Sequence, residues 1–469
     1  MRPRVTLKNR VRHPLRAGVA AGGVVLMLVI VAPALSAQSV ELLQEYLRVD
    51  TTNPPGNESR AVEFFARILE AEGIPYETAE SAPGRGNIWA RLEGGSEPAL
   101  LLLHHTDVVP ADAAYWDVPP LSGEIRGGYV YGRGALDTKT LGIFHLQAFL
   151  ALHRDGRPLN RDVIFMATAD EEAGGLFGAG WLVENRPEVF GGVGFVLNEG
   201  GIGTVDDGRE QIGIEVTQKV PMWLRLVAKG KPGHGSRPRV ESAVTRLVRA
   251  LERIREYEFE PRILPAVDAY FKGIAAAAGE EWERPFADIA RAIKADREFL
   301  TWLQFNNPYW HAITRNTCSI TRLEGSGKIN VVPPTAWAEL DCRMLPDQDP
   351  EAFMEELRSV IDDPGIEIET IMAFTPASSS VDTEVYEAIE TVTREHFPGA
   401  AIVPSVAAGF TDSHFFRDLG MAAYGYSPIV IPLEDLEGVH GNNERVSVEN
   451  VRRGTGIMRE IVERVVHGP

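Results

Sequence analysis

Short apolar runs alternate with helical patterns over the first half of the chain. Residues 99–107 and 162–170 are apolar at nearly every position, and residues 138–156 between them have the spacing of a helix that ends at Gly156. Strands that are apolar on both faces are typical of parallel sheets covered by helices. The pattern therefore predicts an α/β fold, in which a mostly parallel sheet has helices on both faces.

The pattern changes at about Thr217. Residues 217–230 alternate between apolar and polar positions, like a strand of an antiparallel sheet. The order strand–helix–strand–strand–helix–strand follows, with a long helical insert at about 266–305, and resembles a small split βαβ domain. The α/β pattern returns at about Ser380. We therefore predict that an α+β domain, residues 216–376, is inserted into a first domain formed by residues 38–215 and 377–469.

The N-terminal segment differs from the rest of the chain. A run of basic residues between Arg2 and Arg16 precedes the apolar stretch VAAGGVVLMLVIVAPAL and the small residues ALSAQ. This is the pattern of a secretory signal, with cleavage after Ser36 or Ala37. An uncleaved membrane anchor is the alternative, because the apolar stretch is near the lower limit for spanning a bilayer. Residues 1–37 thus predict an exported protein, periplasmic or secreted, which contacts the membrane only if this segment is retained.

Net charge and cysteine content limit the possible partners and sites. The formal net charge of −19 argues against nucleic acid or an anionic membrane surface as a partner. Cys318 and Cys342 are the only cysteines, which excludes a disulfide framework and a cysteine zinc site. Export would allow these two to pair, and two free buried thiols fit the sequence equally well. Any metal ion would have to be held by His, Asp and Glu.

Histidines and acids gather where the predicted strands end. His105 and Asp107 end one strand, and two glutamates end the next, after Asp170, which we expect to support the turn. Taken singly, each residue has a structural explanation, such as an N-cap role for Asp137. Because the carboxyl ends of parallel strands meet at one edge of a sheet, we expect these side chains to converge there. The set comprises His105, Asp107, Asp137, Glu171, Glu172, Glu199 and His440.

Two divalent metal ions would explain both the number and the kind of these residues. Ions about 3.5–4 Å apart need a bridging carboxylate and terminal ligands on each ion. One shared Asp, with one His and one Glu for each ion, supplies five such ligands, and zinc accepts them. A further carboxylate must move the proton of the attacking water, and another must orient a bound imidazole. Asp107 lies two residues from His105, on the same face of the strand, as this last role requires.

Nine short motifs occur in the order of a known family. HTDVVP, GRGALDTK, DEEAGG, NEGG, GHGSRP, INVVPP, DCR, GFTDS and HGNNE extend over nearly the whole chain after the N-terminal segment. The chain resembles the dizinc exopeptidases and deacylases, which include the aminoacylases, carboxypeptidase S, carboxypeptidase G and succinyl-diaminopimelate desuccinylase, and it is most similar to the carboxypeptidase S-like branch. The resemblance implies that His105 and Glu199 bind one zinc ion and Glu172 and His440 the other, with Asp137 as the bridge. It also implies that Glu171 is the general acid/base and that Asp107 orients His105.

The resemblance also implies a role for the inserted domain. In the family this domain is a lid and a dimerisation domain, and the residue that matches His234 reaches a neighbouring active site to stabilise the tetrahedral oxyanion. Spacing alone favours a surface turn for this histidine. Asn330 and Arg343 match lid residues that contact the substrate, although Arg343 could instead pair with the acid two residues before it. Thr411 and Asp412 match a loop that lines the substrate pocket.

Two histidines depart from the family pattern. His104 stands where relatives commonly carry a small residue, which leaves an alternative metal contact open, and alternation along the strand points it away from His105. His414 stands where close relatives often carry Arg, so that the contact with an anionic group of the substrate stays open.

These observations predict the class of enzyme and its partners. We expect an exported hydrolase with two Zn²⁺ ions, which cleaves an amide or peptide bond next to a free carboxylate, as a carboxypeptidase or dipeptidase does; Co²⁺ and Mn²⁺ also suit the ligands. An N-acyl-amino-acid deacylase is the first alternative, because it uses the same metal chemistry. A non-catalytic binding or scaffold protein is the second, although such a protein would be expected to have lost Glu171 or a ligand. The predicted partners are a small peptide or N-acyl amino acid and a second copy of the chain, bound through the inserted domain.

Overall fold

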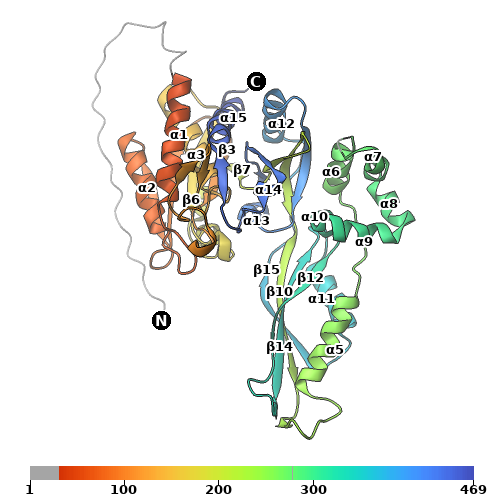
Figure 1. Ribbon diagram of the computed structural model, residues 1–469. Coiled ribbons are helices and arrows are strands. Elements are labelled where there is room, and N and C mark those ends of the chain that lie inside the picture. The colour runs from red at the N-terminus through yellow and green to blue at the C-terminus, as the bar shows by residue number, and fades with distance from the viewer. Residues whose placement is uncertain (1–30, 277, 469) are drawn as a thin grey trace, which may run out of the picture. The chain divides into compact units, whose positions relative to one another are not determined.

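The computed structural model describes residues 31–276 and 278–468 (Figure 1). The chain divides into two compact units. Unit 1 comprises Met1–Glu210, Glu384–Pro398 and Tyr426–Pro469, and unit 2 comprises Gln211–Thr383 and Gly399–Gly425. Unit 2 therefore includes residues 399–425, which the sequence pattern had grouped with the first domain. The domain limits read from the sequence remain a prediction.

The predicted signal or anchor falls largely outside the described part of the chain. That part begins at helix α1 (Val31–Leu47), and most of residues 1–37 precede it. Signal cleavage and export remain predictions. None of the helices in residues 31–276 and 278–468 has both the length and the hydropathy that a membrane span requires.

The main sheet of unit 1 has a parallel centre and, on one side of it, two antiparallel strands. Strand β3 (Glu97–His105) pairs in parallel with β6 (Arg161–Thr168) on one side and with β7 (Val193–Asn198) on the other. Strands β2 (Gly86–Leu92) and β1 (Tyr76–Glu80) continue the sheet beyond β6 in antiparallel order. The predicted α/β fold is confirmed, with these two strands as the antiparallel part. The other strands of this unit are β4 (Glu124–Arg126), β5 (Tyr129–Tyr131), β8 (Gly203–Asp206), β18 (Val430–Pro432) and β19 (Arg445–Ser447).

Helix α3 (Lys139–Asp155) is the central helix of unit 1. It is buried from Lys139 to Leu152, which explains why it is apolar almost all round rather than on one stripe. It contacts strands β3 and β6 and packs against α1 and α15 (Val448–His467). The helix ends at Gly156, as predicted, in the left-handed conformation with φ of 65°. The remaining helices are α2 (Ser59–Ala71), α4 (Ala179–Asn185), α12 (Glu384–His396) and α14 (Leu433–Leu436).

Unit 2 contains a four-stranded antiparallel sheet in the order β12 (Thr317–Glu324), β14 (Thr335–Met344), β10 (Val220–Lys229) and β15 (Ile366–Ala373). Helices α5 (Ala243–Glu256) and α11 (Pro350–Ile361) pack against the sheet around the buried side chains of Leu224 and Leu340. The chain therefore follows the strand–helix–strand–strand–helix–strand order that the sequence predicts. Cys318 and Cys342, opposite each other on β12 and β14, form a disulfide, which settles the pairing that the sequence left open.

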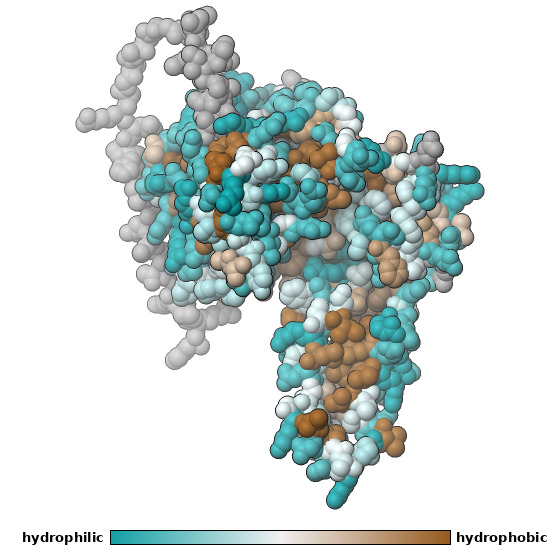
Figure 2. Space-filling model, viewed as in Figure 1, coloured by the Kyte–Doolittle hydropathy of each residue, from teal (hydrophilic) through white to brown (hydrophobic). Residues whose placement is uncertain are grey.

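Apolar side chains remain on the surface of this sheet and its helices. Val248 on α5, Leu323 on β12 and Ile371 on β15 are 58%, 62% and 48% exposed. Figure 2 shows brown, hydrophobic residues among hydrophilic ones on the visible face of this part of unit 2. A contiguous apolar surface is typical of a contact site for another molecule, whereas single exposed apolar side chains are common.

The helical insert of unit 2 consists of five short helices rather than one long element. Side chains of Asp288, Asp296 and Asn307 each accept a hydrogen bond from the first turn of the helix that follows, so that the helical run is interrupted at each cap. The helices pack around an aromatic core that includes Phe271 and Phe286. Their bounds are α6 (Pro265–Ala275), α7 (Glu280–Ala287), α8 (Ile289–Ala295), α9 (Arg297–Asn306) and α10 (Pro308–Ala312). Unit 2 also contains α13 (Ser413–Asp418) and strands β9 (Arg209–Gln218), β11 (Gly233–His234), β13 (Val331–Val332), β16 (Ala401–Ala407) and β17 (Ala422–Gly425).

Candidate metal centre

The side chains predicted to bind metal lie together in unit 1, at the carboxyl ends of its parallel strands. His105 is the last residue of β3, and Glu199 directly follows β7. Glu172 belongs to a single 3-10 turn, Glu171–Ala173, that follows β6. Asp137 lies two residues before α3, and His440 lies in the loop that leads to β19. The strand-end argument from the sequence thus predicts their meeting place.

Asp137 is shared between two groups of potential ligands. One of its carboxylate oxygens, Oδ1, lies 3.0 Å from Nε2 of His105, which is also 3.3 Å from Oε2 of Glu199. The other oxygen, Oδ2, lies 3.1 Å from Nε2 of His440, which is 3.0 Å from Oε2 of Glu172. Within each group, the atoms that could bind a metal all lie within 4.8 Å of one another. The arrangement has two centres with one common carboxylate.

The burial of Glu172 and Glu199 makes their ionised carboxylates unfavourable unless cations are bound nearby. Burial, together with the nearby carboxylates of Asp137 and Glu172, raises the pKa of Glu199 to about 7. Burial also raises the pKa of Glu172. In the described part of the chain, one oxygen of each glutamate, Oε1, is buried without a hydrogen-bond partner. A buried carboxylate oxygen without a donor is costly, and a bound divalent cation would remove that cost. The set of five nitrogen and oxygen ligands therefore fits two metal ions.

Glu171 lies beside His105 of the first group and belongs to neither group. Its carboxylate is buried, and its Oε2 is 4.0 Å from Nε2 of His105. Its main-chain N–H donates to Oδ1 of Asp107 at 3.1 Å, and that of Glu172 donates to Oδ2 at 3.2 Å. Nδ1 of His105 lies 3.0 Å from the main-chain oxygen of Asp107 and 3.5 Å from its carboxylate. Asp107 therefore contacts His105 mainly through its main-chain carbonyl group, while its carboxylate accepts hydrogen bonds from the main-chain N–H groups of Glu171 and Glu172.

Sequence reasoning gave no role to Glu444, which is fully buried in this region. Its Oε1 accepts hydrogen bonds from the N–H groups of Leu136 at 2.6 Å and Asp137 at 3.1 Å. Its Oε2 accepts from the N–H of Gly134 at 2.9 Å and from the guanidinium of Arg133 at 2.8 Å. The signal for this residue was the final acid of HGNNE, four positions after His440. The motif shows the acid but not its partners.

The five predicted substrate residues all lie in unit 2. His234 is exposed, and its Nδ1 accepts a hydrogen bond from the N–H of Ser236 at 3.2 Å. Asn330 is exposed just before β13. Arg343 pairs with Asp341, with Nε 2.6 Å from Oδ1, which is the alternative that the sequence allowed. The hydroxyl of Thr411 donates to Oε1 of Gln218 at 3.0 Å, and Asp412 is buried beside it. Their contacts with substrate remain predictions.

The two unusual histidines are buried and lie outside both ligand groups. His104 points away from His105, since its Nε2 lies 3.3 Å from the hydroxyl of Tyr46. His414 stacks on Phe374 with 3.6 Å between ring centres, and burial lowers its pKa to about 3. The imidazole of His414 is therefore neutral at pH 7 and does not replace the charge of an arginine.

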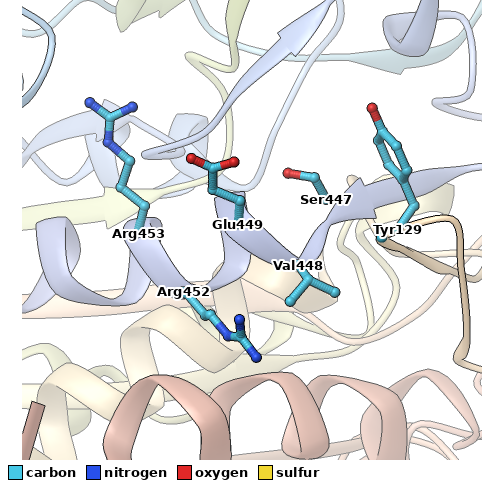
Figure 3. A pocket seen from close by; sticks show the side chains of 7 residues that line it. Tyr129, Ser447, Val448, Glu449, Arg452 and Arg453 are labelled. Atoms are coloured by element: carbon cyan, nitrogen blue, oxygen red, sulfur yellow. The ribbon is translucent and has the colours of Figure 1, made fainter. Parts of the chain in front are cut away.

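A shallow hollow at the start of α15 includes none of the predicted site residues. It is lined by Gly128 and Tyr129 and by side chains at the beginning of the helix, of which Figure 3 shows Glu449, Arg452 and Arg453. Both arginines are exposed. The candidate centre is thus defined by its ligand geometry rather than by this hollow.

Comparison with known proteins supports the family resemblance. Residues 101–464 match the model of peptidase family M20/M25/M40. N-fatty-acyl-amino acid synthase/hydrolase PM20D1 of Xenopus tropicalis is 32% identical over 436 residues, which cover 88% of this chain and 83% of that protein. Aminoacylase-1 of Homo sapiens is 28% identical over 443 residues, which cover 92% of this chain and 96% of that protein.

Solved structures agree on the fold. The M20 family metallo-carboxypeptidase Sso-CP2 from Sulfolobus solfataricus matches with a TM-score of 0.70 and 21% identity, covering 91% of this chain and 98% of its own. Human carnosine dipeptidase 1 matches with a TM-score of 0.64 and 17% identity, covering 92% and 97%. Together with the sequence relatives, these matches confirm the prediction of an enzyme, a metallo-amidohydrolase, rather than a scaffold protein. The chain belongs to peptidase family M20/M25/M40.

Proposed function

We propose that the protein hydrolyses the amide bond of N-acyl amino acids at two bound Zn²⁺ ions. The observation that carries this proposal is the sharing of Asp137 between two ligand groups, with the carboxylate of Glu171 close to His105 of the first. One group would hold one ion through His105 and Glu199, and the other would hold the second through Glu172 and His440. Co²⁺ and Mn²⁺ suit the same ligands. When bound, such ions supply a nucleophile at neutral pH and polarise the carbonyl group of the substrate.

In this mechanism Glu171 moves the proton. Its carboxylate is buried next to His105, so that it can accept a proton from the attacking water and donate it to the nitrogen of the leaving amino acid. Its main-chain N–H donates to Asp107, which fixes the backbone from which the side chain extends. Glu172, the next residue, holds its oxygen toward His440 instead. Two adjacent glutamates would therefore perform different tasks.

Relatives favour N-acyl amino acids over peptides as substrates. The sequence relatives carry the names N-fatty-acyl-amino acid synthase/hydrolase and aminoacylase, and they are more similar to this chain than the peptidases found by fold. The sequence prediction placed the peptidase first and the deacylase second, and the relatives reverse that preference. Dipeptides remain the second candidate, since both substrate classes place an amide next to a free carboxylate.

A substrate panel with metal analysis tests the proposal. Protein loaded with Zn²⁺ would be assayed on N-acyl amino acids of short and long acyl chain and on dipeptides, with Glu171→Gln as the catalytic control. We expect about two metal ions per chain and turnover of the acyl amino acids, which the control lacks. Faster cleavage of dipeptides would favour the second candidate. Failure to bind metal, or equal inertness of both proteins, would refute the proposed function.

We also propose that the protein is exported and forms a homodimer through unit 2. The N-terminal pattern and the disulfide between Cys318 and Cys342 support export, because disulfides persist in oxidising compartments. The exposed apolar side chains of α5, β12 and β15 support a contact through this unit. Cell fractionation with N-terminal sequencing tests export and signal cleavage, and light scattering of the purified protein tests the dimer. A cytosolic protein or a monomer at micromolar concentration would contradict these two proposals.

A further inference from the structure

Two loops near the metal centre have no role in the function proposed so far. They carry the sequences NPPG, residues 53–56, and PGRGN, residues 83–87. We propose that Asn53 and Arg85 in these loops are positioning residues, which fix the main chain of Glu171 and Glu172 through the buried carboxylates of two aspartates. The inference rests on the proposed function, because it assigns these residues an effect on that reaction.

Asp107 binds the main chain of both glutamates through its carboxylate. Its two carboxylate oxygens accept the N–H groups of Glu171 and Glu172 at 3.1 and 3.2 Å. The carboxylate is fully buried, so that its position depends on the donors around it rather than on water. Any shift of Asp107 would therefore move the proton-transfer residue and a metal ligand together.

The side chain of Asn53 connects the carboxylates of Asp107 and Asp170. Its side-chain amide donates to Oδ2 of Asp107 at 2.8 Å and lies 3.3 Å from Oδ1 of Asp170. Asn53 is 6% exposed, and both aspartates are buried. Two buried carboxylates repel each other unless a donor lies between them, and this amide provides that donor. The bridge ties Asp107 to the residue that directly precedes Glu171.

The carboxylate of Asp170 forms an ion pair with Arg85. Nη2 of Arg85 lies 2.6 Å from Oδ1 of Asp170 and 2.8 Å from Oε1 of Glu58. The guanidinium occupies space that a side chain at residue 56 would fill, since a Cβ on Gly56 would lie 2.6 Å from its Cζ atom. The other oxygen of Asp170 accepts the N–H of Phe177 at 2.9 Å. Gly56 of NPPG therefore leaves the space that the guanidinium of Arg85 needs to form its ion pair with Asp170.

The backbone of Asp170 shows why this hold matters. Its φ is 74°, in the left-handed region that a non-glycine residue adopts at a cost of about 1 kcal/mol. Such a conformation persists only when surrounding contacts fix it. The contacts with Arg85, Asn53 and the N–H of Phe177 do so, and the chain turns here directly into Glu171. The network therefore fixes the direction in which the main chain of Glu171 and Glu172 continues after strand β6.

Kinetics and metal spectroscopy test the inference on the metal-loaded protein. We expect Asn53→Leu and Arg85→Met to lower kcat about 10- to 100-fold with little change in KM, as is typical when a partner of a metal ligand is lost. We also expect them to change the visible absorption spectrum of the Co²⁺-loaded protein. Arg91→Met is the matched control, because Arg91 forms a partly buried ion pair with Asp162 on the same sheet and contacts none of the predicted site residues. This control should lose stability only.

A double variant separates positioning from a purely structural role. In Arg85→Met the carboxylate of Glu58, whose pKa is raised to about 7 by burial, loses its cation. Adding Glu58→Gln should therefore restore the part of the thermal stability that is lost through Glu58. If Arg85 positions Asp170, kcat stays low in the stable double variant, and if Arg85 is only structural, kcat recovers with stability. Should Arg85→Met fail to fold, Asn53→Leu, which changes no charge, decides by the same kcat and Co²⁺ spectrum.

Other results distinguish this inference from the proposed function. Wild-type kcat and an unchanged Co²⁺ spectrum in folded Asn53→Leu and Arg85→Met, with an active wild-type protein, would overturn the inference alone. A wild-type protein that binds no metal and cleaves no member of the panel would overturn the proposed function and this inference with it.

Discussion

The carboxylate of Glu444 holds the main chain of Asp137. Its Oε1 accepts the N–H of Asp137 at 3.1 Å and that of Leu136 at 2.6 Å, while Oε2 is paired with the buried guanidinium of Arg133. That guanidinium also donates to the carbonyl of Gly441 at 2.6 Å, next to His440. The shared ligand and one terminal ligand are therefore connected through a single buried ion pair.

We predict that Glu444→Gln weakens metal binding without unfolding the protein. The amide keeps the volume of the side chain but turns one acceptor oxygen into a donor that faces main-chain N–H groups or Arg133. Affinity for Zn²⁺, measured by competition with a chelator, should fall about 10- to 100-fold. Glu449→Gln, the same change at an exposed position, should leave it unaltered. Equal affinities in the two variants would contradict the role given to Glu444.

Substitution of the adjacent glutamates should separate their tasks. Glu172→Ala removes an oxygen that lies 3.0 Å from His440 within one ligand group, so the protein should lose metal. Glu171→Gln should keep both metal ions and lower kcat about 10²- to 10⁴-fold, because only proton transfer is lost. Metal content by elemental analysis and kcat on the best substrate measure the two effects. Loss of metal to the same extent in both variants would show that the division is wrong.

Removal of the disulfide should destabilise unit 2 and spare the metal centre. Cys318 and Cys342 join strands β12 and β14 across a sequence separation of 24, and a loop of this size corresponds to about 3.5 kcal/mol of unfolding free energy. All seven residues predicted at the centre lie in unit 1. Replacing both cysteines by alanine should therefore lower the urea midpoint of unit 2 while the metal content stays constant. A midpoint unaffected by the replacement and by a reducing agent would contradict this.

The sequence predicts where the ligands meet because the apolar runs show where each strand ends. Apolar runs locate β3, β6 and β7, and the residues that follow them, such as His105 and Glu199, must share one edge of the sheet. Asp137 follows no strand of this sheet. Its place was predicted from the start of the next helix and from the family motif.

Contacts between loops far apart in the chain cannot be read in this way. Arg85 and Asp170 are 85 positions apart, and Arg133 and Glu444 are 311 apart, so no local pattern connects them. The antiparallel direction of β2 beside β6 cannot be read from the sequence either, because it depends on which strands the fold makes neighbours. The interruptions of the helical insert were readable in principle, since Asp288, Asp296 and Asn307 are strong cap residues.

The stability of unit 2 should fall in mild acid because of His414. Its imidazole lies between Phe374 and Phe415, with ring centres 3.6 and 3.7 Å away, and neither ring nitrogen has a hydrogen-bond partner in the described chain. Burial, aided by the charge of Arg417, lowers its pKa to about 3. An unfolded histidine has a pKa of about 6.5. The folded state, which keeps His414 neutral, is therefore not penalised by this residue above about pH 6.5. As the pH falls from about 6.5 to 3, the unfolded chain binds a proton that the folded chain does not, and the free energy of unfolding decreases progressively.

Replacing this histidine by a ring that cannot titrate should remove part of the acid sensitivity. Between pH 8 and pH 5, protonation in the unfolded chain alone should cost the wild-type protein about 2 kcal/mol through this one residue. His414→Phe keeps an aromatic ring between Phe374 and Phe415 but has no proton to bind. Urea unfolding of unit 2 at the two pH values should thus show a smaller loss of free energy for the variant, by about that amount. Equal losses would mean that His414 binds its proton as readily in the folded protein as in the unfolded chain, which would contradict the buried, neutral imidazole described here.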